Sequence, residues 1–475
     1  MQNEPTVWSL VDRHADDLIA MSDRVWAIPE ICYTEYRSVA EHTAMLREKG
    51  FRVTENVAGI PTAVIGEAGE GGPIIGFLGE YDALPGLSQE AGVAEPRPLP
   101  GNGHGHGCGH NLLGGAALLA ACAIKDWLEE TGTPGRVRYY GCPAEEGGAA
   151  KSFMARDGAF DGVAAAITWH PGAFNEVAPA LSLANTRMDF EFTGRSSHAA
   201  ASPHLGRSAL DAAQLMCTGV QYLREHIPQE SRIHYAFLDA GGVAPNVVQA
   251  KAKLRFAIRS PELPGMFDLI ERVKKIAQGA AMMTETTVDI STMSAVSNLL
   301  PNRPLEEAMY ANWLRMGPPV FDEADRAFAR DIQGTLTERE IDSAWARAGV
   351  PRQDDMPLCD FIVPLGTEGE KMIGSTDVGD VSWIVPTVQA HAATIAIGTP
   401  GHSWQVTAQG KMPAAHKAMV HVARIMAGTA LDCLVDPALL AAARADLDAR
   451  LARSPYICPI PGDVKPPLQP RPQDL

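Results

Sequence analysis

The chain lacks the long apolar run that a membrane-spanning helix needs. No uninterrupted apolar stretch among its 475 residues reaches the roughly 18 that would cross a bilayer, and the nearest candidate, residues 112–124, is too short. The N-terminus also lacks the basic segment followed by an apolar core that marks a secretory signal. We therefore expect neither a membrane span nor a membrane partner.

Basic residues and cysteines are scarce as well. The chain has 40 Lys and Arg against 57 Asp and Glu, a net charge of -17 that disfavours nucleic acid as a partner. Its 8 cysteines are scattered without a pairing pattern, which is typical of reduced thiols and predicts a cytoplasmic protein. With 46% apolar residues and this length, we expect a globular protein of more than one domain.

Strand-like and helical segments alternate in the first third of the chain. Residues 16–48 have helical spacing, and Asn111 is a candidate N-cap for a helix that continues to about residue 130. Short apolar runs predict strands at residues 62–66, 73–79, 136–141 and 163–168. Near the C-terminus, residues 394–398 indicate a further strand and residues 414–430 a helix. This alternation predicts a sheet covered by helices on both faces.

The middle of the chain has a different pattern. A strand with alternating apolar residues at 188–192 is followed by a helix, two strands, a second helix and a last strand, at 207–226, 232–238, 252–259, 263–282 and 286–292. This order is that of the ferredoxin-like unit. We predict an α/β/α domain with a mixed sheet, residues 1–184 and 296–475, interrupted by an inserted α+β domain, residues 185–295. The charged stretch 321–352 is predicted to be a solvated helical excursion, and the proline-rich tail from residue 455 an extended strap.

The most unusual segment is residues 101–110, Gly-Asn-Gly-His-Gly-His-Gly-Cys-Gly-His, in which Cys108 and His110 stand with two further histidines between single glycines. Taken alone, it fits a flexible loop or an adventitious metal binder as well as a site. Three other polar segments also follow predicted strands, and they contain Glu145-Glu146, His170 and His402. Because ligands gather at the carboxyl ends of strands in open α/β sheets, we expect these segments to converge.

Cysteine, histidine and carboxylate together form the ligand set of zinc and related divalent ions. If two such ions share a water, one of the paired acids Glu145 and Glu146 can take the proton of that water while the other binds metal. Asp82, at the end of another strand, is placed to orient a ligand imidazole.

These motifs resemble the dinuclear metal amidohydrolases and peptidases that include aminoacylases, glutamate carboxypeptidases and plant auxin-conjugate hydrolases. The motifs follow the order of that family along essentially the whole chain: Glu80-Tyr-Asp82-Ala-Leu-Pro, His106-Gly-Cys108-Gly-His110, Glu145-Glu146-Gly-Gly, His170-Pro, Ser197-His198-Ala and Gly401-His402. The resemblance implies a metal-dependent hydrolase with two Mn²⁺ or Zn²⁺ ions per chain that cleaves the amide of N-acyl or N-aroyl amino acids. It also implies that the inserted domain is a lid and dimerisation domain, in a homodimer or in a hetero-oligomer with a homologous subunit.

The resemblance assigns roles residue by residue. It implies five metal ligands, which are Cys108, His110, Glu146, His170 and His402. Glu145 corresponds to the general base, and His198 to a residue that stabilises the tetrahedral oxyanion in the neighbouring subunit's site. Asn246 and Arg259 lie where the family commonly binds the substrate carboxylate. The sequence departs from the family at Asn111, where auxin-conjugate hydrolases usually have Asp, and at Glu80, where the carboxypeptidase branch has a histidine ligand.

Other functions fit parts of this pattern. A broad N-acyl-amino-acid deacylase or dipeptidase would use the same groups. A non-catalytic partner subunit of a hetero-oligomeric hydrolase is a different class, and the presence of Glu145 beside every expected ligand disfavours it. A metal-storage protein is disfavoured by the same base and by the carboxylate-binding residues.

Overall fold

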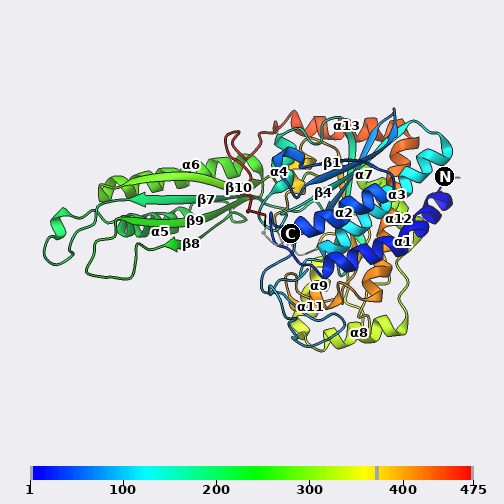
Figure 1. Cartoon of the computed structure of the whole chain (residues 1–475), viewed down its shortest axis with the longest axis horizontal. Coiled ribbons are helices and arrows are strands. Elements are labelled where there is room, and N and C mark those ends of the chain that lie inside the picture. Colours follow the sequence, from blue (N-terminus) through cyan, green and yellow to red (C-terminus); the bar gives the residue numbers. More distant parts are fainter. Residues whose placement is uncertain (1–3, 370–373, 472–475) are drawn as a thin grey trace.

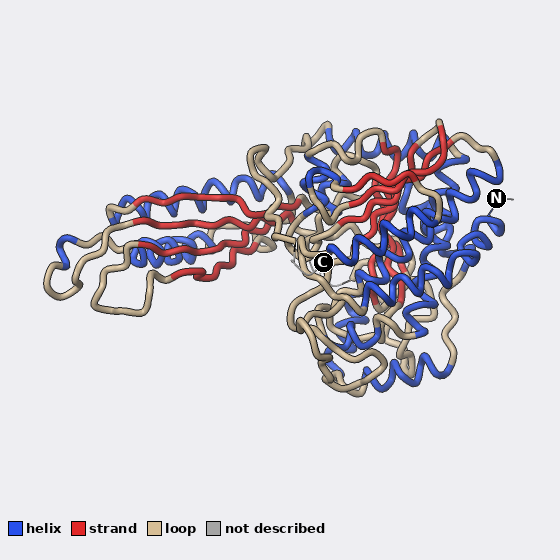
Figure 2. Tube along the Cα trace, in the orientation of Figure 1, coloured by secondary structure: helices blue, strands red, loops and turns tan. Residues whose placement is uncertain are grey.

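The computed structural model describes residues 4–369 and 374–471. Figure 1 shows a large lobe that contains one sheet and a long arm that contains a second. The tube in Figure 2 separates the two sheets clearly, with helices along the arm and on both sides of the sheet in the lobe. The arm is formed by the middle of the chain, and both flanking parts of the sequence fold into the lobe.

The lobe is built on a seven-stranded mixed sheet in the order β1-β2-β4-β3-β5-β11-β6. Its strands are β1 (Arg52–Glu55), β2 (Val64–Glu70), β3 (Ile74–Glu80), β4 (Gly135–Cys142), β5 (Val163–Gly172), β6 (Glu176–Val177) and β11 (Thr387–Ala393). The four neighbours β4, β3, β5 and β11 run parallel to one another. Their carboxyl ends therefore meet at one edge of the sheet.

Helices cover both faces of this sheet, as predicted. On β3, Ile75 and Phe77 belong to the core beneath the long helices, while Leu78 belongs to a second core on the other face, because successive strand residues point to opposite sides. The first face carries α1 (Glu4–Trp26), α3 (His110–Thr131), α7 (Arg303–Met316) and α12 (Pro413–Val435), with α13 (Pro437–Leu451) against α7. The other face carries α4 (Ala150–Arg156) and α10 (Val378–Ser382).

Two of these helices are long and apolar enough to cross a membrane by length and composition. They are α3 and α12, and 89% and 78% of their most apolar windows are buried inside the protein. Both helices pack between α1 and the sheet, so they are core helices of the lobe.

Two helix predictions were wrong in detail. The segment 16–48 forms the end of α1 and a separate α2 (Tyr36–Glu48). Pro29 lies in the break, where it cannot donate an amide hydrogen and disfavours helical geometry in the residue before it. Asn111 does not cap α3, because the helix begins at His110 and Asn111 lies inside it, donating from its side-chain amide to the Gly410 carbonyl oxygen at 2.9 Å.

The predicted strand at 394–398 was also wrong, since β11 ends at Ala393. In the following loop the Ala396 amide donates to Gln409 Oε1 at 2.7 Å, and the Ile397 amide donates to the Pro357 carbonyl oxygen at 2.9 Å. The amides of Ala396 and Ile397 are thus satisfied without strand pairing. A short buried apolar run does not by itself distinguish these two arrangements.

The arm has the strand and helix order that the sequence predicted. It contains β7 (Ala184–Thr193), α5 (Ala209–Arg224), β8 (Arg232–Asp239), β9 (Lys251–Ser260), α6 (Leu263–Thr284) and β10 (Thr287–Val296). The strands form an antiparallel sheet in the order β10-β7-β9-β8. Met188, Phe190 and Phe192 are buried on one face of β7 in a core shared with both helices. Two short 3-10 turns are also present, η1 (Val57–Gly59) between β1 and β2 of the lobe and η2 (Pro203–Leu205) between β7 and α5 of the arm.

The charged stretch 321–352 is helical but is not simply solvated, which corrects the prediction. It forms α8 (Glu323–Gln333) and α9 (Glu338–Ala348), and Ile332, Ile341 and Trp345 are buried in a core with Phe174. The apolar residues repeat at helical spacing beneath the charges, so one face of each helix is buried. In the tail, Tyr456 donates to Asp380 Oδ1 at 2.8 Å, and no helix or strand is found over residues 455–471. The last four residues of the predicted strap lie outside the described residues.

Candidate metal centre and active-site cavity

Polar groups collect at the edge of the sheet where β4, β3, β5 and β11 end. Cys108, Glu145, Glu146, His170 and His402 all line one cavity of about 1080 Å³ at this edge. Residues 79–85, 142–148 and 398–404 reach it from β3, β4 and β11. The edge predicted from strand order is therefore where the polar segments meet.

The potential metal-binding atoms form three overlapping groups, and the atoms of each group lie within 4.8 Å of one another. The groups are Cys108 with His110 and His170, Cys108 with Glu146 and His402, and Glu80 with His110 and Glu145. Cys108 Sγ lies 3.4 Å from His170 Nε2, and His402 Nε2 lies 3.3 Å from Glu146 Oε2. All five side chains that the resemblance implies as ligands are thus brought together, with Glu80 in addition.

Glycine is required where the 101–110 segment approaches its neighbours. Gly109 has a φ of 76°, in the left-handed region, and a Cβ there would lie 2.9 Å from Pro171 Cγ. The close approach places Cys108 and His110 beside His170. On the other side, the His402 amide donates to the Gly107 carbonyl oxygen at 3.1 Å, which fixes the loop after β11 against the same segment.

His110 is oriented by Asp82. His110 Nδ1 lies 2.9 Å from Asp82 Oδ1, and Asp82 Oδ2 accepts a hydrogen bond from the Glu146 amide at 2.9 Å. With the Nδ1 hydrogen donated to Asp82, the Nε2 lone pair faces Glu80 Oε2 at 3.2 Å. Although burial opposes it, the nearby Cys108 and Asp82 raise the pKa of His110 well above its usual value, so this position favours positive charge.

The donor atoms fit a bound cation. His110 Nε2, Glu80 Oε2 and Glu146 Oε1 are buried and lack a hydrogen-bond partner among the described residues. Buried polar atoms without partners are costly, and His110 Nε2 lies 3.2 Å from Glu80 Oε2 and 4.0 Å from Glu146 Oε1. A divalent ion would satisfy them, and imidazole, thiolate and carboxylate are the donors that Zn²⁺ and Mn²⁺ accept in proteins.

The two adjacent acids lie in different groups. Glu146 is beside His402. Burial raises the pKa of Glu146, but the hydrogen bond from His402 and the nearby His110 together outweigh burial and hold this pKa below its usual range. Burial, together with Glu80 and Glu146, raises the pKa of Glu145 well above its usual value. Both acids lie in a tight turn, and Ala144, directly before them, is in the left-handed region with a φ of 56°. Neighbouring carboxyls whose pKa values are pushed apart suit different roles in proton transfer.

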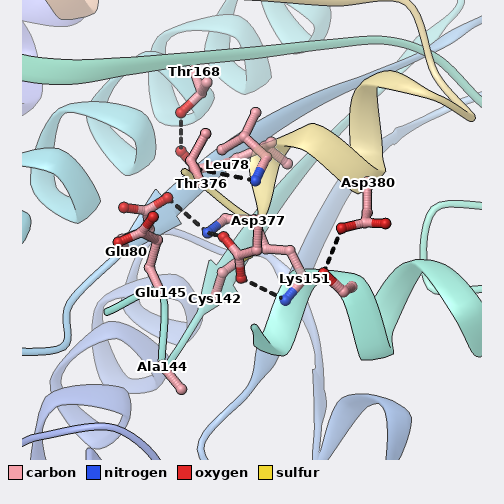
Figure 3. A network of polar contacts seen from close by, with 12 residues as sticks. Leu78, Glu80, Cys142, Ala144, Glu145, Lys151, Thr168, Thr376, Asp377 and Asp380 are labelled. Carbon is pink, nitrogen blue, oxygen red and sulfur yellow. Dashed lines mark hydrogen bonds and ion pairs between the residues drawn. The ribbon is translucent and has the colours of Figure 1, made fainter. Parts of the chain in front are cut away.

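A buried ion network lies next to this site and shares Glu80 with it (Figure 3). The Lys151 ammonium lies between Glu80 Oε1 and Asp377 Oδ1, 2.6 Å from each, and the three side chains are at most 3% exposed. Burial lowers the pKa of Lys151, but Asp377 and Glu80 outweigh this effect and raise it well above its usual value. The Lys151 amide also donates to Asp377 Oδ2 at 2.9 Å, which ties α4 to the start of α10. The network fixes Glu80 beside His110.

We expect Lys151→Met to be strongly destabilising, by about 3–5 kcal/mol, because it leaves two buried carboxylates without their cation. Urea unfolding of the variant and of the wild type measures the change. Lys274→Met is the matched control, since Lys274 is partly exposed and pairs with Glu271 on the surface of α6, and it should cost about 1 kcal/mol or less. Equal unfolding midpoints for the two variants would contradict a structural role for the network.

The remaining predicted residues divide into two groups. Arg259 on β9 lines the cavity. His198 and Asn246 do not line it, and both side chains are exposed on the arm. They lie close together, because the Ala199 amide donates to the Asn246 carbonyl oxygen at 2.9 Å, and His198 Nδ1 accepts a hydrogen bond from the Ala201 amide at 3.1 Å. Within one chain, the structure does not bring these two residues to the cavity.

Several residues of the site were missed by the sequence reasoning. Lys151 and Asp377 carry the buried network, and Arg187 on β7 lines the cavity beside Arg259. One signal was available, since Lys151 is a single cation within the apolar stretch 149–155. The prediction that 321–352 is solvated also missed the polar face of α9, whose residues line the cavity.

Comparisons with known proteins now bear on this site. Residues 76–444 match the model of peptidase family M20/M25/M40. The chain belongs to this family. It is 45% identical over 456 residues to the B subunit of p-aminobenzoyl-glutamate hydrolase from Escherichia coli (strain K12), covering 94% of this chain and 95% of that protein. It is 29% identical to the Xaa-Arg dipeptidase of Mus musculus, covering 93% and 91% of the two chains.

Solved structures agree on the fold. A dinuclear metal binding peptidase of the M20 family from Bacillus subtilis superimposes with a TM-score of 0.59 at 16% identity, covering 89% of this chain and 99% of that one. The family resemblance stated from the motifs is confirmed, and so is the expectation of a hydrolase that acts on amide bonds. The motifs in residues 103–114, 140–148, 202–211 and 375–383 point within this family to the B subunit of p-aminobenzoyl-glutamate hydrolase, and the comparison confirms that likeness.

Proposed function

We propose that this protein is a two-metal amidohydrolase that cleaves the amide between an acyl or aroyl group and an amino acid, with p-aminobenzoyl-glutamate as the first substrate to test. The observation that carries the proposal is the convergence of five potential ligands and a sixth side chain, Glu145, into three overlapping groups, and all of these side chains except the buried His110 line one cavity. The similarity to the B subunit of p-aminobenzoyl-glutamate hydrolase supports the choice of substrate.

Two divalent ions, Mn²⁺ or Zn²⁺, would be held by Cys108, His110, Glu146, His170 and His402. When bound, such ions supply Lewis-acid activation of water and of the scissile carbonyl. Glu145 would accept a proton from the attacking water and then donate it to the amine nitrogen that leaves. Arg259 would hold the carboxylate of the substrate at the wall formed by the arm.

His198 and Asn246 would act in the site of a second protomer. Their exposure and distance from the cavity of their own chain support this assignment, because a role in catalysis then requires a partner. We propose a homodimer in which the arm supplies the contact and His198 donates to the oxyanion of the partner's substrate. A hetero-oligomer with a homologous chain is the alternative, supported by similarity to both the A and the B subunits of p-aminobenzoyl-glutamate hydrolase. The free cysteines support a cytoplasmic location.

The proposal predicts amide hydrolysis by the purified single chain. Aminobenzoyl, benzoyl and aliphatic acyl amino acids should be tested with Mn²⁺ and with Zn²⁺, and release of the free amino acid should be followed by chromatography. We expect turnover that a chelator abolishes and that added metal restores. Preference for aliphatic acyl groups or dipeptides would favour the broader deacylase, a function that the similarity to the Xaa-Arg dipeptidase also supports. Inactivity of the metal-loaded chain, reversed only by a homologous partner chain, would make it a non-catalytic partner.

A further inference from the structure

Helix α9 presents a polar stripe to the cavity. Arg339, Ser343 and Arg347 recur every four residues, a spacing that places side chains on one face of a helix, and all three line the cavity. The opposite side of the helix is anchored in the core by Ile341, Ala344, Trp345 and Ala348. The helix is therefore held with its two arginines toward the site, although it is far in sequence from the metal-binding motifs.

Neither arginine forms an ion pair with an acid of α9. The acids on the outer side of the helix, Glu338 and Asp342, both pair with Arg352. The Glu340 carboxylate accepts hydrogen bonds from the Thr337 amide at 2.7 Å and from its hydroxyl at 2.8 Å, which caps the helix start.

Arg347 Nη1 donates to Ser343 Oγ at 2.8 Å. No carboxylate of residues 4–369 and 374–471 forms an ion pair with Arg339 or Arg347. In a chain with a net charge of -17, two cavity-lining guanidinium groups that pair with no carboxylate of the described residues can bind an anion.

The arm provides a second basic wall in the same cavity. Arg187 and Arg259 lie near each other on β7 and β9, and burial together with Arg187 lowers the pKa of Arg259. Arg187 donates to the Gly147 carbonyl oxygen at 3.1 Å. Arg259 Nε is buried without a hydrogen-bond partner among the described residues, and so is Oδ1 of Asn185, the residue paired with Arg259 across the sheet. This wall is the one to which the proposed function assigns the first carboxylate.

We propose that α9 is a specificity wall, on which Arg339 and Arg347 bind a second carboxylate of the substrate, so that the preferred amides carry two carboxylates. The inference rests on the proposed function. A planar guanidinium matches a carboxylate with two parallel hydrogen bonds, which favours arginine over other donors for this purpose. The cavity of about 1080 Å³ has room for an aroyl amino acid that spans both walls.

The second carboxylate can belong to the amino acid or to the acyl group, and two substrate pairs distinguish these sources. N-benzoyl-glutamate and N-benzoyl-glutamine have nearly the same shape but differ in side-chain charge. N-succinyl-leucine and N-succinamoyl-leucine differ in the same way on the acyl side. We expect the wild type to prefer the charged member of the first pair by about 10- to 100-fold in kcat/KM, the range of a charge-assisted hydrogen bond. A preference confined to the second pair would assign the carboxylate to the acyl group.

The variants Arg339→Gln and Arg347→Gln should reduce this preference by about tenfold or more. Arg352→Gln is the matched control, because Arg352 follows the same helix and pairs with its outer acids, and its preference should equal that of the wild type. Thermal unfolding of each variant verifies that the fold is retained. An unchanged preference in both cavity variants, for both pairs, would overturn the proposal.

Binding measurements distinguish a failure of this inference from a failure of the proposed function. Calorimetric titration of the Glu145→Gln protein with the same four compounds measures the charge preference without turnover. Absence of hydrolysis in the wild type would remove the proposed function, yet tighter binding of the dicarboxylate that is lost in Arg347→Gln would still support the wall. Hydrolysis without any charge preference in turnover or binding would refute the wall and leave the proposed function intact.

Discussion

Glu145→Gln is expected to lower kcat by about 10²–10⁴ while the protein keeps its metal, because the amide retains the shape of the side chain but cannot accept a proton. Glu145 is partly buried beside Glu80 and Glu146, and these surroundings raise its pKa in the metal-free chain. Bound cations would restore the ionised form that a base needs. Steady-state kinetics and metal analysis of the same preparation measure both effects.

Glu146→Gln is the matched variant, since it removes the neighbouring carboxylate from the group with Cys108 and His402. We expect it to lose bound metal together with activity. If Glu145→Gln lost the metal and Glu146→Gln kept it, the two acids would have to exchange roles.

The second large effect is expected when protomers that carry different variants are combined in one dimer. His198→Ala and Glu145→Ala dimers should each be nearly inactive, since loss of an oxyanion donor typically costs about 10²–10³ in kcat. After exchange of protomers between the two variants, one site of each mixed dimer combines an intact Glu145 with the partner's intact His198. With random pairing, about half of the dimers are mixed and carry one good site, which gives roughly a quarter of wild-type activity. The activity of the exchanged mixture, against each variant incubated alone, tests this expectation.

Exchange of protomers must be verified independently, for example by mass spectrometry of differently labelled chains. Exchange without recovery of activity would mean that His198 acts in its own chain or has only a structural role. The exposed position of His198 outside the cavity of its own chain leads us to expect recovery.

Much of the fold could be predicted from the sequence because its periodic patterns are strong. The alternation of Met188, Phe190 and Phe192 with polar residues identified β7, and the order of elements around it identified the arm. Predictions failed where a local pattern has two solutions. The apolar run at 394–398 could be a strand or a buried loop, and contacts with the Gln409 side chain and the Pro357 carbonyl, which the local pattern does not contain, favour the loop.

Predictions about the candidate site succeeded and failed for the same reasons. Cys108, His110 and Glu145 stand in motifs whose residue types reveal their chemistry, and the structure brings them into overlapping groups of potential ligands. Lys151 and Asp377 are far apart in sequence, and their 2.6 Å contact depends on the packing of α4 against α10. The polar face of α9 was missed for a related reason, because a charged helical stripe indicates solvent unless the tertiary fold places a cavity against it.

Metal titration of the metal-free chain tests the central claim most directly. Mn²⁺ or Zn²⁺ is added stepwise to the purified protein while hydrolysis of p-aminobenzoyl-glutamate and bound metal are both followed. We predict that activity rises from zero to a plateau near two ions per chain, and that Cys108→Ala, which removes a ligand shared by two of the three groups, binds less metal and stays inactive. Undiminished hydrolysis by the metal-free chain, or full metal occupancy in Cys108→Ala, would contradict the account.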